Sequence, residues 1–92
     1  MTNSRIHKRS VSLEGHRTSV SVEDEVWTLL GFFAEERGVS RASLIAQLDH
    51  ERIARGFGPE TGGLSTAIRL FVLHNLAERA GLAHLVSPDN TQ

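Results

Sequence analysis

Residues 17–45 read RTSVSVEDEVWTLLGFFAEERGVSRASLI, and the hydrophobic period of this stretch changes partway along it. From residue 18 to residue 22, polar and apolar side chains alternate, which is the pattern of a half-buried β-strand. From residue 23 to about residue 37, apolar side chains recur at helical spacing behind three acids, whose charge suits the first turn of a helix. The stretch therefore predicts a short strand that runs directly into a helix.

A second helix is predicted after a short break at residues 38–40. Gly38 suits the position that ends the first helix, because glycine accepts the left-handed backbone found there. Ser40 suits the N-cap of the second helix, which is expected to run to about Arg55.

The strand at residues 18–22 needs a partner, because its backbone N–H and C=O groups cannot stay unpaired. The simplest partner is the same strand of a second copy, paired about a two-fold axis. Another lies upstream, where residues 9–13 alternate weakly before a turn signal at residues 14–16. These upstream residues predict either the first strand of a hairpin or only an extended arm, and the sequence leaves both open.

A third helix is predicted towards the C-terminus. Residues 56–63 contain four glycines and one proline, so they are expected to form a loop. The helix then runs from about residue 66 to about residue 80, with Ser65 as its cap and Gly81 after its end. The expected segments are a basic arm at 1–15, a core at 16–55, the loop at 56–63, a helical extension at 64–86 and a polar tail at 87–92.

Length and composition predict one small cytoplasmic domain. A chain of 92 residues buries a limited share of its surface, so oligomerisation would help to stabilise it. It has no cysteine, which excludes disulfides and thiolate metal sites and fits a reducing compartment. There is no apolar run long enough for a membrane span and no apolar stretch of a signal peptide near the N-terminus, so no membrane partner is expected.

Charge is distributed unevenly along a chain whose net charge is only −1. Residues 1–22 carry four basic residues against one acid, a net of +3, whereas residues 23–92 carry six against ten acids, a net of −4. The basic charge therefore accompanies the predicted strand, as expected of a basic arm on a neutral body. The alternative is a basic tail with no partner.

Nothing in the sequence indicates an enzyme. No nucleophile–base arrangement, paired-carboxylate signature or phosphate-binding loop is found, and the glycine-rich loop follows a helix rather than a strand. The five histidines lack the close spacing of metal ligands. We therefore expect no catalytic residue, no metal and no cofactor.

Three motifs follow one another in residues 18–48: TSVSV at 18–22, EERG at 35–38 and SRASLI at 40–45. In this order and spacing they resemble the ribbon-helix-helix family, the fold of the Met and Arc repressors. The chain is also similar to a bacterial subgroup with the motifs KRSV, here at 8–11, and GHRTS, here at 15–19, and with an extra C-terminal helix.

The resemblance implies a mainly α fold with a short β-ribbon. In this fold, two copies pair their strands as an intermolecular antiparallel two-stranded ribbon in a homodimer, here with a third C-terminal helix. It also implies a bacterial DNA-binding protein, a transcriptional repressor that reads the major groove of double-stranded DNA with the ribbon. Arg17, Ser19 and Ser21 share the strand face opposite to Val20 and Val22, and on the family pattern these three contact bases.

Further site residues follow from the same resemblance. The residues expected to contact DNA phosphates are Lys8, Arg9, Ser40, Arg41 and Ser43. The start of the second helix offers free N–H groups to an anion, although capping alone explains Ser40. The residues expected in the core of the dimer are Val20, Val22, Leu30, Phe33, Leu44, Ile45 and Leu48.

The first helix departs from the plain two-helix pattern at Leu29, Gly31 and Phe32. An apolar second face needs a cover, so we predict that the third helix packs on it, in the same chain or in the other protomer, with Gly31 allowing close approach. The alternative function is a dimeric protein-interaction module, such as an antitoxin, that binds a protein partner. Its working surface would be the third helix and its surroundings, with Phe57, Leu73, Leu82 and Leu85.

Overall fold

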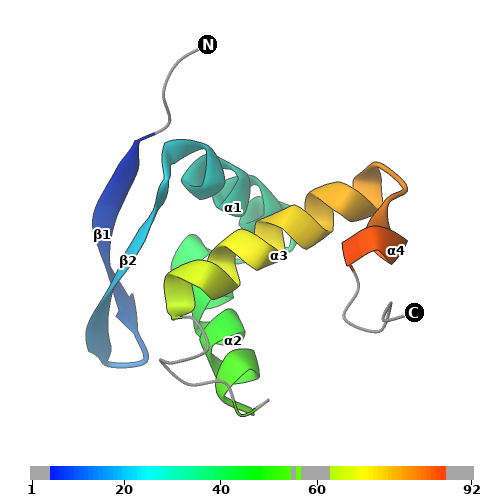
Figure 1. Ribbon diagram of the computed structural model, residues 1–92. Coiled ribbons are helices and arrows are strands. Elements are labelled where there is room, and N and C mark those ends of the chain that lie inside the picture. Colours follow the sequence, from blue (N-terminus) through cyan, green and yellow to red (C-terminus); the bar gives the residue numbers. More distant parts are fainter. Residues whose placement is uncertain (1–4, 55, 57–62, 87–92) are drawn as a thin grey trace.

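All the helices lie on one face of a small sheet (Figure 1). The computed structural model describes residues 5–54, 56 and 63–86, so most of the loop expected at 56–63, including Phe57, lies outside the described residues. The elements run in the order β1 (Ile6–Leu13), β2 (His16–Glu23), α1 (Asp24–Glu36), α2 (Arg41–Ala54), α3 (Leu64–Arg79) and α4 (Ala83–Val86). This mainly helical fold with a two-stranded antiparallel sheet confirms the predicted fold class.

The sheet is a hairpin made by one chain. β1 and β2 pair in antiparallel register from Ile6 opposite Glu23 to Leu13 opposite His16. The turn between them has two residues, Glu14 and Gly15, whose φ angles of 50° and 88° are both positive. Two positive φ angles give the type of turn whose twist matches that of the flanking strands. The upstream segment, which the sequence left open between a strand and an arm, is therefore a strand of eight residues.

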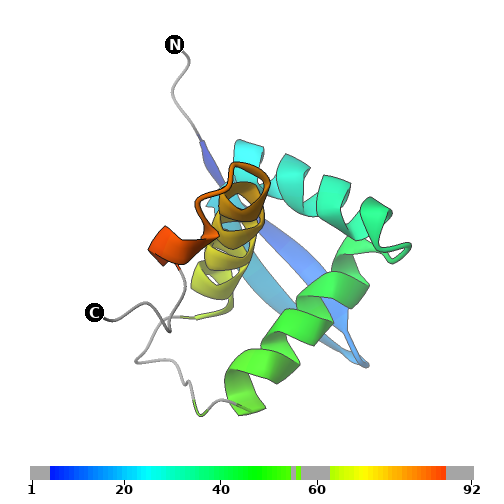
Figure 2. The ribbon, with the colours of Figure 1, turned by 90° about the vertical axis from the view of Figure 1, so that its right-hand side faces the viewer.

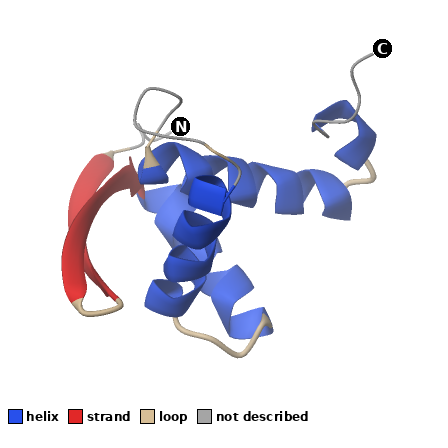
Figure 3. Ribbon diagram, turned by 90° about the horizontal axis from the view of Figure 1, so that it is seen from below, coloured by secondary structure: helices blue, strands red, loops and turns tan. Residues whose placement is uncertain are grey.

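β2 has its own neighbour β1 along one edge, whereas the sequence predicted a partner strand from a second chain. A two-residue turn brings the two strands together at little cost in chain entropy, and for this reason the intrachain pair forms readily. A second copy could pair with β2 only along its other edge, and such pairing between two copies stays a prediction. Figure 3 shows the two strands at one side of the molecule, with the helices packed against them.

One chain builds a core of its own between the hairpin and the helices. All seven residues predicted for a dimer core are buried here by the chain's own elements, and Val20, Val22 and Ile45 are completely inaccessible. The other buried residues are Leu13, Ala34, Leu64, Ile68 and Val72. The third helix thus contributes to the core rather than covering it from outside. Figure 2 shows the hairpin running behind α1 and α2, which diverge from the short link between them.

The link between α1 and α2 has the geometry that its residues predicted. Gly38 has a φ of 71°, and its N–H donates to the carbonyl of Glu35 at 3.0 Å. The N–H of Val39 donates to the carbonyl of Ala34 at 3.0 Å, which completes the double hydrogen bond typical of helix ends. The hydroxyl of Ser40 accepts from the N–H of Ser43 at 3.0 Å, so Ser40 is the N-cap of α2.

The start of α3 differs from the prediction. The N-cap position belongs to Gly63, and Ser65 lies inside the helix with its hydroxyl directed to β2 rather than to its own helix. The predicted end is confirmed, because Gly81 has a φ of 77° directly after Ala80 at the C-cap. Residues 83–86 form the short α4, inside the helical extension expected at 64–86.

α3 covers the second face of α1 only in part. The rings of Phe33 and Phe71 meet edge to face, with centroids 6.0 Å apart, so the two helices are in contact. Leu29 is half-buried, but Phe32 stays 47% exposed beside Arg79. Gly31 does allow a close approach, but the predicted partner was wrong. The group that approaches Gly31 is the side chain of Arg41 and not α3.

Candidate nucleic-acid interface

The hairpin presents a polar face away from the helices. Val20 and Val22 are buried against the helices, so the side chains of Arg17, Ser19 and Ser21 lie on the opposite face, as predicted. The register places a residue of β1 beside each of the three: Ser12 opposite Arg17, Ser10 opposite Ser19 and Lys8 opposite Ser21. We call these six residues the outer face.

Charge and hydrogen-bonding groups are ordered along the outer face. Arg17 lies at the turn end of the hairpin and Lys8 towards the other end, and the other four positions are serines. None of the six is acidic; Ser21 is half-buried and the other five are exposed. A two-stranded ribbon fits the major groove, where arginine grips guanine with two hydrogen bonds and serine hydroxyls both donate and accept. The outer face therefore carries positive charge and hydrogen-bonding groups of the kinds that base edges and phosphates accept.

Two outer-face residues, Ser10 and Ser12, were missed by the sequence reasoning. They belong to the segment whose strand character was left open, so their face could not be assigned. The available signal was the pair Glu14–Gly15, because a two-residue turn fixes the register of both strands.

Lys8 and Arg9, both predicted to contact phosphates, are placed differently. Lys8 is exposed on the outer face, whereas Arg9 faces the helices. The Arg9 guanidinium lies 2.9 Å from a carboxylate oxygen of Asp24 and 4.7 Å from the centre of the Trp27 ring. Its hydrogen bond holds the pKa of the Asp24 carboxyl below its usual range. A phosphate contact by Arg9 would require it to leave these partners.

Arg41, at the start of α2, is also held by Trp27. Its guanidinium lies 5.0 Å from the centre of the Trp27 ring, and its Nε donates to the Trp27 carbonyl at 3.1 Å. Arg9 and Arg41 therefore meet at one indole, which links β1 to the N-terminus of α2. Ser40 and Ser43 are exposed beside Arg41, and a shallow groove of about 610 Å³ there is lined in part by Gly31 and Ser40.

The structure thus brings the predicted site residues into two groups. Arg17, Ser19, Ser21 and Lys8 share the outer face, whereas Ser40, Arg41 and Ser43 gather at the start of α2. Arg9 belongs to neither surface. Among the described residues, no group of three or more metal-ligating side chains is found and no helix is long and apolar enough to cross a membrane.

Comparison with known proteins gives one match. A family model for the ribbon-helix-helix domain matches residues 6–76, which run from the start of β1 into the last turns of α3. No curated protein and no solved structure matches the chain.

Proposed function

The chain belongs to the ribbon-helix-helix family, whose members are generally DNA-binding transcription regulators or antitoxins, and on that premise we propose that it binds DNA as a homodimer and represses transcription. The observation that carries the proposal is the outer face, six exposed or half-exposed positions with two cations, four hydroxyls and no acid. Such a face is suited to base edges in the major groove.

The roles within this surface differ with the chemistry of the side chains. Arg17 is the base-reading residue, because a guanidinium matches the two acceptors of guanine better than a hydroxyl does. Lys8 supplies a point charge to the DNA backbone, and the start of α2 supplies free N–H groups beside Arg41. The contacts of Lys8 and of the start of α2 with DNA phosphates position the protein without reading sequence. They also make the affinity for DNA depend on salt.

Fluorescence anisotropy with pools of short genomic duplexes, at low and at moderate salt, tests the proposal. Wild-type protein is expected to bind and to enrich particular sequences. Arg17→Ala should relax the sequence preference, whereas Lys8→Ala should weaken binding to all sequences alike. Arg79→Ala is the matched control, because Arg79 pairs with Glu36 on the helical side and its loss removes the same charge. Absence of binding by the wild-type dimer at low salt would reject the proposal.

A second candidate function is binding of a protein partner, as in an antitoxin. The observation that favours it is the exposure of leucines in α3, in α4 and in the link between them: Leu73, Leu82 and Leu85 are 48%, 46% and 62% exposed. A protein partner would cover these apolar side chains. Co-purification of one stoichiometric protein, lost in Leu73→Asp but kept in Arg17→Ala, would support this function.

A further inference from the structure

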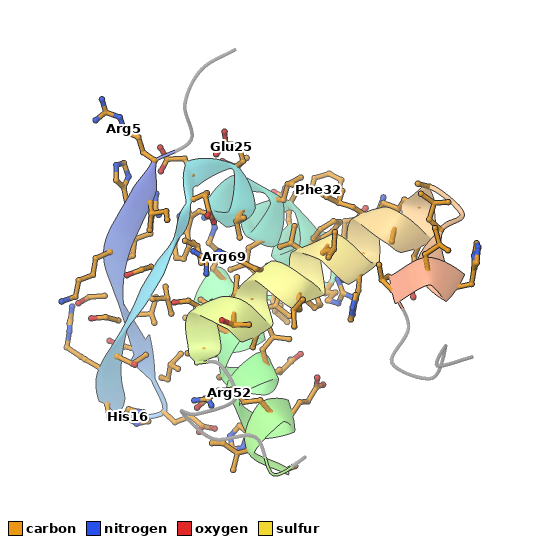
Figure 4. The ribbon with its side chains drawn as sticks, viewed as in Figure 1. Arg5, His16, Glu25, Phe32, Arg52 and Arg69 are labelled. Atoms are coloured by element: carbon orange, nitrogen blue, oxygen red, sulfur yellow. The ribbon has the colours of Figure 1, made fainter. Side chains whose placement is uncertain are left out.

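The edge of β2 that faces away from β1 is held by α3. In an antiparallel pair, the backbone groups of every second residue point away from the partner strand. At Ser21 both groups have partners in α3: its N–H donates to Oγ of Ser65 at 2.8 Å, and its carbonyl accepts from Nη2 of Arg69 at 3.1 Å. Figure 4 shows Arg69 between α3 and β2.

These two bonds replace those of a neighbouring strand. A strand beside Ser21 would offer it one acceptor and one donor, which are the roles that Ser65 and Arg69 fill. Arg69 is fixed further by a contact of 2.9 Å between its Nε and a carboxylate oxygen of Glu23. This hydrogen bond also holds the pKa of Glu23 below its usual value. The first turns of α3 thus close part of an edge that would otherwise be open to pairing.

The backbone of Ser19, two residues before Ser21, differs from it. Among the described residues, none bonds the backbone of Ser19 from the side facing away from β1. A second copy of β2 is a chemically suitable occupant, because alternation places valines on one face and hydroxyls on the other in both copies. A two-fold register centred on Ser19 sets Ser21 opposite Arg17 of the other copy, and one centred on Val20 sets it opposite Ser19. Both registers need the N–H and the carbonyl of Ser21, which are bonded to Ser65 and Arg69 of α3.

We propose that the first turns of α3 lock the open edge of β2, so that a second copy pairs there only after Ser65 and Arg69 release Ser21. The proposal rests on the proposed function, since the paired dimer is the form that would bind DNA. The side chains of Ser65 and Arg69 and a paired strand compete for the same backbone groups of Ser21. Conditions or partners that loosen α3 therefore promote assembly of the dimer.

Sedimentation velocity over a range of protein concentrations, without DNA, tests the lock. The double variant Ser65→Ala/Arg69→Ala is expected to lower the dimer dissociation constant by about tenfold or more, since two hydrogen bonds no longer compete with pairing. Arg79→Ala is the control, because it removes an arginine of α3 that pairs with Glu36 and not with β2. An unchanged or weaker dimer in the double variant, with native circular dichroism, would overturn the proposal.

A milder measurement applies if the double variant does not fold. Amide hydrogen exchange of Ser21 reports the lock directly in Ser65→Ala, which removes one hydroxyl from α3. At low protein concentration, exchange at Ser21 should be faster than in the wild type, and it should slow again as the concentration rises and a second copy pairs there. Exchange that is equally slow in both proteins at every concentration would contradict the lock.

Cysteine reporters identify the strand that replaces α3, and the chain has no native cysteine to interfere. If the register is centred on Ser19, Ser19→Cys alone should form a disulfide between chains, because directly opposed residues of antiparallel strands have Cβ atoms about 4.5–5.5 Å apart. If it is centred on Val20, a mixture of Ser19→Cys and Ser21→Cys should form the disulfide instead. The crosslinks should form faster when Ser65 and Arg69 are also replaced. Absence of crosslinks in both backgrounds would rule out this edge as the interface.

DNA titration of the same proteins separates the two proposals. If the lock variants dimerise more tightly but no form binds DNA, the lock stands and the proposed function fails. If the wild type binds DNA and the lock variants dimerise no better than it does, the lock fails and the proposed function stands.

Discussion

The guanidinium of Arg41 lies so close to the backbone of Gly31 that a Cβ atom at position 31 would fall 2.1 Å from its Nη2. A glycine in the middle of α1 therefore makes room for a side chain from the start of α2. In this position Arg41 stays over Trp27 and bonds the Trp27 carbonyl. A weak helix former is thus present at a position of α1 where a side chain would displace Arg41.

Gly31→Ala should displace the Arg41 side chain while changing stability little. The gain in helix propensity, about 1 kcal/mol, opposes the loss of a hydrogen bond and a cation–π contact, which together contribute about 1–2 kcal/mol. The free energy of unfolding, measured in urea, should therefore change by about 1 kcal/mol or less. The fluorescence emission of Trp27, the single tryptophan, should shift. A large loss of stability with unchanged tryptophan emission would show that the Arg41 side chain cannot move aside.

Replacement of the outer-face serines of β1 should change DNA preference. Ser10→Ala and Ser12→Ala remove hydroxyls that lie beside Ser19 and Arg17, and we expect discrimination between bases to fall by about 1 kcal/mol at the positions contacted. Selection from a randomised duplex pool measures this. Thr66→Ala, on the exposed side of α3, is the control. If both serine variants select the same DNA sequences as the wild type, the serines of β1 do not read bases and base reading is confined to β2.

The contact between His50 and Glu14 should make stability depend on pH. Nε2 of His50 lies 2.9 Å from the Glu14 carboxylate, which ties the hairpin turn to α2 and raises the pKa of His50 above its usual value of 6.5. A raised pKa in the folded state stabilises the protein fully below the unfolded value, and this contribution is lost as pH rises through the folded pKa. The wild type should therefore have a higher midpoint of thermal unfolding than His50→Gln, and the difference between the two midpoints should be larger at about pH 5.5 than at about pH 9.

His16→Gln is the matched control for that experiment, since His16 adjoins the same turn and is exposed. Its unfolding midpoint should follow the wild type across the same pH range. If His50→Gln and the wild type keep a constant difference over that range, the His50–Glu14 contact does not contribute in solution.

α3 should prove to be an integral part of the core. Ile68→Ala removes a fully buried side chain and is expected to cost about 2–5 kcal/mol in the free energy of unfolding. Leu70→Ala, two residues away and 46% exposed, should change it by about 0.5 kcal/mol or less. Denaturant unfolding measures both variants. Equal, small effects would mean that α3 is only loosely attached.

Local signals in the sequence predicted the helices and the link between α1 and α2. Hydrophobic spacing located the helices, and the residue types at Gly38, Ser40 and Gly81 matched the backbone conformations or caps found there. Each of these signals depends on neighbours a few residues away, which is why it can be identified without a structure.

Long-range partners could not be predicted in the same way. Ser65 has the residue type and the position of a helix cap, but its hydroxyl bonds to Ser21, which is 44 residues distant. Lys8 and Arg9 are adjacent in sequence, yet the strand turns one to solvent and the other to Asp24. The sides on which Lys8 and Arg9 lie follow once the turn at Glu14–Gly15 fixes the register of β1. The partner of Ser65 depends on where α3 docks, and no local pattern determines that.

Amide chemical shifts during titration with a selected duplex show which surface of the protein meets DNA. If the outer face of the hairpin binds DNA, the largest shift changes should occur in β1 and β2 around Ser10, Ser12, Arg17 and Ser19, with smaller changes at the start of α2. Shift changes confined to α3 and α4, or no shift changes at low salt, would show that the outer face does not bind DNA.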